Sequence, residues 1–141
     1  MIDSWYYDAC ALDSGTEVYG EMTSKSNPIR PIVSHLALGE AYGNCHNKGK
    51  AQEDAFLRLM RVASRKMEIV GNDGIEEILS ITKETFPKLS FTDAIHLATA
   101  IKFKCNIFRT SDNDFCGLDH EKVKKYGSNF EIPNFRIKKV G

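Results

Sequence analysis

Carboxylates stand at several points where the sequence changes from one predicted element to the next. Asp8 interrupts the apolar segment "WYYDACAL", and Glu40 follows the apolar residues of "HLAL". The others surround a later segment, with Asp93 at the start of "DAIHLATAI" and Asp112 and Asp114 directly after "NIFRT". Grouped carboxylate oxygens are the ligands that Mg²⁺ and Mn²⁺ prefer. These residues could therefore form a divalent-metal site if the fold brings them together.

Short apolar segments alternate with helical ones along the chain. We expect strands at 5–12, 29–34, 66–71, 106–110 and 135–140, and helices at 35–47, 51–65, 73–86, 90–104 and 119–127. Ser34, Asp73 and Ser90 are expected to cap three of these helices, and the helix at 51–65 has its apolar residues on one face. Strands separated by helices need crossover connections, which give a parallel sheet covered by helices on both faces. The sequence therefore predicts an α/β three-layer domain with a small, mostly parallel sheet. Residues 1–141 are expected to form this single domain, and residues 13–31 a loop.

The topology of such a sheet predicts where the acids lie. A helix that follows a strand starts at the carboxyl end of that strand, and a helix that precedes a strand must also start at this edge. Glu40 is near the start of a helix after a strand, Asp93 is near the start of a helix before a strand, and Asp112 follows a strand. Asp8 lies toward the end of the first strand. We therefore expect all four at one edge of the sheet, where ligand crevices form.

Each acid also has a purely structural interpretation. Ser90 and Asp93 fit a capping box, "SFTD", in which the acid only completes the start of a helix. Asp112 and Asp114 could form a turn or cap a helix, and Glu40 could be a solvent-facing helix residue. Asp8 is the hardest to explain in this way, because a carboxylate in an apolar strand carries a desolvation penalty unless a cation or donor offsets it.

Composition and simple sequence patterns argue against a strongly basic nucleic-acid-binding protein, a zinc protein and a membrane protein. Lysine and arginine total 19, as do aspartate and glutamate, so any surface that binds nucleic acid must be local. The four cysteines show no zinc-ligand spacing. No export signal is visible, and no apolar segment reaches the roughly 18 residues that a membrane helix requires. We therefore expect a soluble cytoplasmic protein without a membrane segment. Local basic groups that could guide RNA are Arg58, Arg61 and Arg65, Lys102 with Lys104, Lys122 with Lys124 and Lys125, and Lys138 with Lys139. A solvated polar face explains each of them at least as well.

Four motifs taken in order resemble the PIN-domain family, which includes the VapC-type toxins. They are "YYDACAL", "IVSHLALGE", "LSFTDAIHLATAI" and "FRTSDNDF", and together they cover residues 5–116. The resemblance implies a metal-dependent endoribonuclease that hydrolyses phosphodiester bonds of single-stranded or structured RNA. It implies a catalytic quartet of Asp8, Glu40, Asp93 and Asp112. Metal ligation is expected from Asp8, Asp93, Asp112 and Asp114.

The resemblance further implies Mg²⁺ or Mn²⁺, which would activate water for in-line attack and leave 5′-phosphate and 3′-hydroxyl ends. Glu40 is expected to orient the water. An antitoxin-type protein partner and a homodimer are implied by the family alone.

Two features depart from the family, and two alternatives stay open. Ala9 and Cys10 follow the first aspartate, where the family has small polar residues, and residues 13–31 do not have the pattern of an amphipathic helix. One alternative is a catalytically inert PIN-like module that binds RNA or protein. Another is a phosphohydrolase or receiver-like domain, although such a phosphatase would need a D-x-D motif after the first strand, where this chain has "DAC".

Overall fold

The computed structural model of the chain describes residues 20, 22–26, 28–110 and 112–139. The chain forms two compact units, one that extends to Val70 and one that begins at Gly71. The predicted strand at 5–12, with Asp8 and the Ala9–Cys10 pair, lies outside the described residues. The expectation of a single domain over residues 1–141 stays a prediction.

The first unit contains two strands and two long helices. The chain passes through β1 (Ile32–Ser34), α3 (His35–Lys48), α4 (Lys50–Ala63) and β2 (Glu68–Val70). β1 and β2 pair in parallel, as the sequence predicted, with Val33 opposite Ile69. The predicted cap of α3 is confirmed, because the Ala37 N–H donates to Ser34 Oγ at 3.1 Å. Gly49 separates α3 from α4 with φ 117°, a conformation that favours glycine.

The core of the first unit lies between α3, α4 and β1. Val33, Ala37 and Ala41 are fully buried there. The predicted apolar face of α4 is only partly buried, since Phe56 and Leu59 are covered whereas Ala51 is exposed. Ala51 lies in the first turn of the helix, where fewer neighbours cover a side chain.

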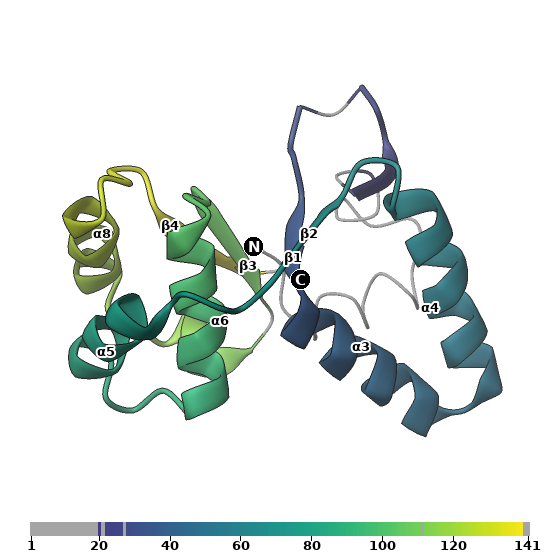
Figure 1. Cartoon of the computed structure of the whole chain (residues 1–141), viewed down its shortest axis with the longest axis horizontal. Helices are drawn as coiled ribbons and strands as arrows, with labels where there is room; N and C mark the ends of the chain where they lie inside the picture. The colour runs from purple at the N-terminus through teal and green to yellow at the C-terminus, as the bar shows by residue number, and fades with distance from the viewer. Residues whose placement is uncertain (1–19, 21, 27, 111, 140–141) are drawn as a thin grey trace. The chain divides into compact units, whose positions relative to one another are not determined.

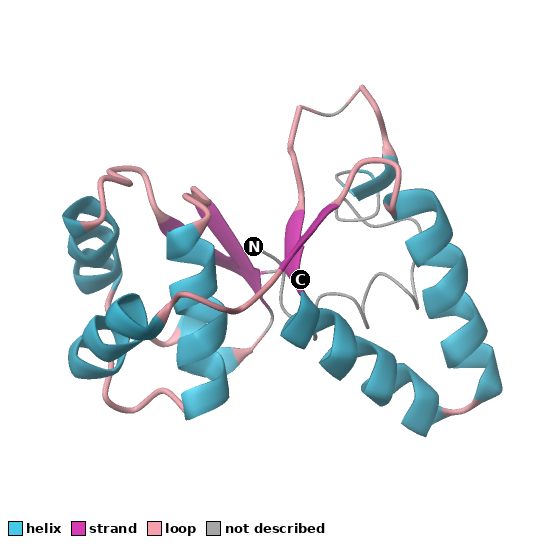
Figure 2. Cartoon of the chain, in the orientation of Figure 1, coloured by secondary structure: helices cyan, strands magenta, loops and turns pink. Residues whose placement is uncertain are grey.

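The second unit holds the remaining elements. They are α5 (Glu76–Thr85), α6 (Phe91–Lys102), β3 (Ile107–Thr110), α7 (Asn113–Cys116), α8 (His120–Asn129) and β4 (Arg136–Lys139). β3 and β4 form a second parallel pair in which Thr110 lies opposite Lys139. Figure 1 shows α5 beside α6, and Figure 2 shows how short the strands of this unit are. α6 is the most deeply buried helix of this unit, with every side chain from His96 to Ile101 covered.

Aromatic side chains fill the core of the second unit. Tyr126 on α8 makes edge-to-face contacts with Phe86 at 5.2 Å and with Phe130 at 5.3 Å between ring centroids. Its hydroxyl forms a hydrogen bond with Thr82 Oγ1 at 2.5 Å, which gives this buried polar group a partner. Burial raises the pKa of Tyr126 to about 12. Phe108 on β3 packs against Phe115 on α7, with ring centroids 4.8 Å apart.

One predicted helix start is wrong. Asp73 was expected to cap the helix over 73–86, but α5 begins at Glu76, after Ile75 in the cap position. Gly74 has φ 69°, a left-handed conformation that an α-helix does not continue through. The backbone carbonyl of Asp73 accepts a hydrogen bond from Lys102 Nζ at 2.5 Å, so this residue is held by α6.

The α/β fold class with parallel strands is confirmed, because helices alternate with small parallel sheets in both units. The predicted Ser90 start of the helix before β3 is confirmed as well, at the N-cap of α6. Among the residues that the structure describes, no helix combines the length and the apolar character needed to cross a membrane.

Candidate metal centre

Helix α6 fixes the position of Asp93. Ser90 is the N-cap residue, and its Oγ accepts a hydrogen bond from the Asp93 N–H at 3.1 Å. The carbonyl of Ser90 accepts the next bond, from the Ala94 N–H at 2.9 Å. Asp93 is thus held in the first turn of the helix, where the positive end of the helix dipole favours a carboxylate.

The turn after β3 fixes Asp112 and Asp114. The Asp112 N–H donates to Thr110 Oγ1 at 3.0 Å, and Thr110 is fully buried at the end of the strand. Asp112 Oδ1 in turn accepts the Asp114 N–H at 2.8 Å and caps the short helix α7. Two local hydrogen bonds therefore hold both aspartates beside the end of β3.

The structure brings Asp93, Asp112 and Asp114 together. One carboxylate oxygen from each lies within 4.8 Å of the others. Asp93 and Asp112 are half-buried, and Asp114 is exposed. These three residues are called the aspartate triad from here on. Asp93 lies in the first turn of α6, whereas Asp112 and Asp114 lie at the start of α7, after β3. The topology expected from the sequence places Asp93 and Asp112 at one edge of the sheet, and in the structure these two residues do lie close together.

The three carboxylates of the triad affect one another's charge. Burial raises the pKa of Asp93, and the charges of Asp112 and Asp114 raise it further. Hydrogen bonding to the Ser90 side chain and the attraction of His96 act in the opposite direction. Within the described part of the chain, no lysine or arginine forms an ion pair with any of the three carboxylates. A bound cation would remove this repulsion.

The donor set fits a hard divalent cation. Mg²⁺ binds oxygen at about 2.1 Å, so two oxygen ligands of one octahedral ion are about 3 Å apart when adjacent and about 4.2 Å apart when opposite. The triad oxygens lie within 4.8 Å of one another, so the three carboxylates are near enough to reach one ion. All three ligand groups are carboxylates, which suit Mg²⁺ or Mn²⁺ better than metals that prefer nitrogen or sulfur.

The structure confirms that Ser90 and Asp112 are N-cap residues. Ser90 does cap α6 through the Asp93 backbone, and Asp112 does cap α7. Asp93 gives its N–H to the cap, and its carboxylate also has a hydrogen bond with the Ser90 side chain, whereas a cap needs only one oxygen of Asp112. Capping accounts for where each aspartate lies in its own element, but not for the approach of the three carboxylates to one another.

The other predicted site residues come from the part of the chain before Gly71. Glu40 lies on α3, in the unit that extends to Val70, and its side chain is half-buried. Asp8 lies outside the described residues. The membership of Glu40 and Asp8 in one quartet with the triad stays a prediction.

Two supporting residues have clear functions in the geometry. Thr110 ends β3, and its side-chain oxygen holds the backbone of Asp112. His96, one turn after Asp93, is 2% exposed and contributes to the charge balance at Asp93. The depth of His96 could not be read from the sequence, because the helix has apolar residues on most of its sides.

Comparison with known families identifies one match. The family model described as PIN domain matches residues 17–121, a segment that contains Glu40 and the whole aspartate triad. Comparison with curated proteins and with solved structures gives no match. The matched segment is well over half of the chain, and it includes all three acids of the aspartate triad. The chain therefore belongs to the PIN domain family.

Proposed function

We propose that this protein is a divalent-metal-dependent endoribonuclease that hydrolyses phosphodiester bonds in single-stranded or structured RNA. PIN domains are nuclease-type domains that generally use divalent metal ions, and this supports the reaction class. The observation that carries the proposal is the aspartate triad, whose oxygens lie within 4.8 Å of one another without a basic partner among the described residues. Such a cluster suits a nuclease, because a metal bound to the carboxylates would also offset the negative charge of the RNA phosphate.

The residues divide the work in the following way. Asp93, Asp112 and Asp114 hold Mg²⁺ or Mn²⁺, with Asp8 as a further ligand and Glu40 orienting the attacking water. When bound, the metal acidifies water and offsets negative charge on the phosphate. Ser90 and Thr110 keep Asp93 and Asp112 in place through the backbone bonds described above. The half-buried setting of Asp93 limits screening by solvent and strengthens its attraction for a cation.

A second candidate is an inert PIN-like module that binds RNA or protein. The observation that favours it is the Ala9–Cys10 pair, which lacks a hydroxyl after the first aspartate. The family also suggests a toxin in the cytoplasm with an antitoxin partner, and a homodimer. These assignments rest on the resemblance to the family alone.

The first test is calorimetric titration of Mn²⁺ and Mg²⁺ into the metal-free protein. Asp112→Asn is the variant, because asparagine caps a helix as well as aspartate does. Asp119→Asn is the matched control, since Asp119 caps α8 by accepting the N–H groups of Glu121 and Lys122 and is not part of the triad. We expect at least tenfold weaker metal binding in Asp112→Asn and unchanged binding in Asp119→Asn.

The same preparations are then incubated with a mixed single-stranded RNA, with and without metal. Cleavage that requires Mn²⁺ or Mg²⁺ and disappears in Asp112→Asn would support the nuclease. Metal binding without cleavage would transfer the assignment to the inert module. If neither metal binds, the triad is not a metal centre and the proposal is wrong.

A further inference from the structure

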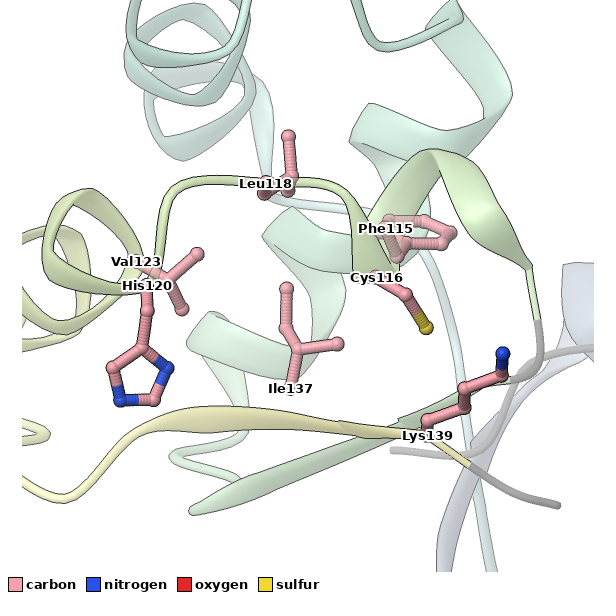
Figure 3. A pocket seen from close by; sticks show the side chains of 7 residues that line it. All are labelled: Phe115, Cys116, Leu118, His120, Val123, Ile137 and Lys139. Carbon is pink, nitrogen blue, oxygen red and sulfur yellow. The ribbon is translucent and has the colours of Figure 1, made fainter.

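A pocket opens in the second unit beside the helix that carries Asp114. Its volume is about 270 Å³, and its lining comes from α7, the turn after it, α8 and β4. The lining residues are Phe115, Cys116, Leu118, His120, Val123, Ile137 and Lys139. Figure 3 shows Ile137 in the middle of the pocket, with the polar ends of His120 and Lys139 on opposite sides of it. The pocket is thus an apolar surface with a basic group at either end.

The pairing of β3 with β4 places Lys139 at the same end of the sheet as the triad. Lys139 lies opposite Thr110, the residue that holds the backbone of Asp112. Ile137 lies opposite Phe108, whose ring packs on Phe115 of α7. Because alternate residues of a strand point to the same face, Ile137 and Lys139 both lie on the face that α7 covers.

Lys139 gives the pocket a charge that is opposite in sign to the charge of the triad. Lys139 is exposed, and its ammonium group forms no ion pair within the described parts of the chain. An ammonium at the rim of an apolar pocket attracts an anion that carries an apolar group. A nucleotide has this chemistry, since its phosphate is anionic and the faces of its base are apolar.

We propose that this pocket is a nucleotide-binding subsite that holds one nucleotide of the RNA beside the scissile phosphate. The phosphate of that nucleotide binds Lys139, its base and sugar lie against Ile137 and Leu118, and His120 donates to the base or sugar at the far end. The choice of RNA as the ligand rests on the proposed nuclease function. The volume is just below the range of about 300–1,000 Å³ that is typical of small-molecule pockets, so it suits one nucleotide and not a longer segment.

The test starts with the full chain in its metal-free form, in which RNA stays intact. The four nucleoside 5′-monophosphates, inorganic phosphate and the free nucleosides are titrated separately while the methyl signals of Leu118, Val123 and Ile137 are followed by NMR. We expect the methyl signals to shift with the monophosphates and to shift less with the nucleosides. Phosphate alone should leave the methyl signals unchanged, because it lacks the apolar part.

Binding of a short single-stranded RNA is then measured at several salt concentrations. In Lys139→Gln we expect about tenfold weaker binding, and a loss of about 0.7 from the slope of log K against log salt, the value for one phosphate contact on a single strand. Lys124→Gln is the matched control, because it removes the same charge from an exposed position on α8 outside the pocket. Its affinity and its salt slope should match those of the wild type.

Cleavage in the presence of Mn²⁺ separates this proposal from the nuclease proposal. RNA cleavage by the wild type with equal rates in Lys139→Gln and Lys124→Gln would keep the nuclease and overturn the subsite. Nucleotide binding at the pocket without cleavage by any preparation would support the subsite and contradict the nuclease. Methyl signals that do not respond to any monophosphate would also overturn the subsite. An apolar segment of a protein partner would then be the alternative ligand of the pocket.

Discussion

At the scale of single residues, the backbone of Asp93 stabilises a helix start, whereas its carboxylate lies in an unfavourable place in the metal-free protein. Its backbone N–H completes the cap of α6. Its carboxylate, however, is half-buried and faces the charges of Asp112 and Asp114, so its pKa is raised. A residue that served only as a cap would have no need of these neighbours. The conflict makes Asp93 the residue at which the metal-site interpretation is easiest to test by stability.

Asp93→Asn should stabilise the metal-free protein at neutral pH. The substitution removes one charge from the triad, and two unit charges about 4 Å apart in water interact by about 1 kcal/mol. We expect a gain of this size in the free energy of unfolding, measured by urea denaturation in the presence of a chelator. Asp119→Asn should change the same quantity by less than about 0.5 kcal/mol, because asparagine replaces aspartate well at an N-cap. A loss of stability in Asp93→Asn would mean that the hydrogen bond to the Ser90 side chain and the attraction of His96 outweigh the repulsion within the triad.

The gap in stability between Asp93→Asn and the wild type should depend on pH. The folded state raises the pKa of Asp93 above its ordinary value of 3.8, so folding disfavours the ionised form. The cost is fully present above the raised pKa, and it fades as the pH falls through that value toward 3.8. We therefore expect the gap to be constant near neutral pH and to close on acidification, in urea denaturations repeated across this range. A gap that widens at low pH would contradict the direction of the shift.

At the scale of elements, the sequence predicted best what local chemistry decides. Ser34 and Ser90 were identified as caps because a hydroxyl before an apolar helix satisfies backbone N–H groups whatever the rest of the fold does. Asp73 has the same local signal, but the left-handed Gly74 and the bond from Lys102 to the Asp73 carbonyl delay the start of α5. That bond joins residues far apart in the sequence, so no local pattern could reveal it.

The packing of α8 on the segment before β4 was also invisible in the sequence, and it yields a prediction. A Cβ added at Gly127 would lie 2.3 Å from Phe135 Cβ and 2.9 Å from the Ile132 carbonyl oxygen. We expect Gly127→Ala to lower the free energy of unfolding by about 1–3 kcal/mol, the usual cost of overpacking a core.

Gly39→Ala is the control for this prediction, because Gly39 lies inside α3 and a Cβ there meets nothing within 4 Å. It should raise the stability by up to about 1 kcal/mol, since alanine has the higher helix propensity. Thermal denaturation of both variants checks the pair. Equal effects would show that the close approach at Gly127 relaxes without cost.

At the scale of the whole molecule, the candidate site was predicted from topology and not from adjacency. No two of Glu40, Asp93 and Asp112 are close in sequence, yet parallel strands with crossover helices placed Asp93 and Asp112 at the same end of β3, where the structure has them. The pocket at Lys139 could not be predicted in this way. Its lining residues Cys116, His120 and Lys139 meet only through the packing of α7 and α8 on β4.

The predicted quartet draws its acids from both units, and this has a measurable consequence. A ligand that binds only the folded state stabilises it by about 2.7 kcal/mol at a concentration 100 times its dissociation constant. If Glu40 joins the triad at the metal, Mn²⁺ should slow hydrogen exchange about a hundredfold in α3 as well as in α6 and β3, for amides that exchange when their own unit unfolds while the other stays folded. Asp112→Asn should abolish the protection in both units, and Glu40→Gln should reduce it. Protection confined to residues from Gly71 onward would remove Glu40 from the quartet and leave the aspartate triad as the whole metal centre of the described chain.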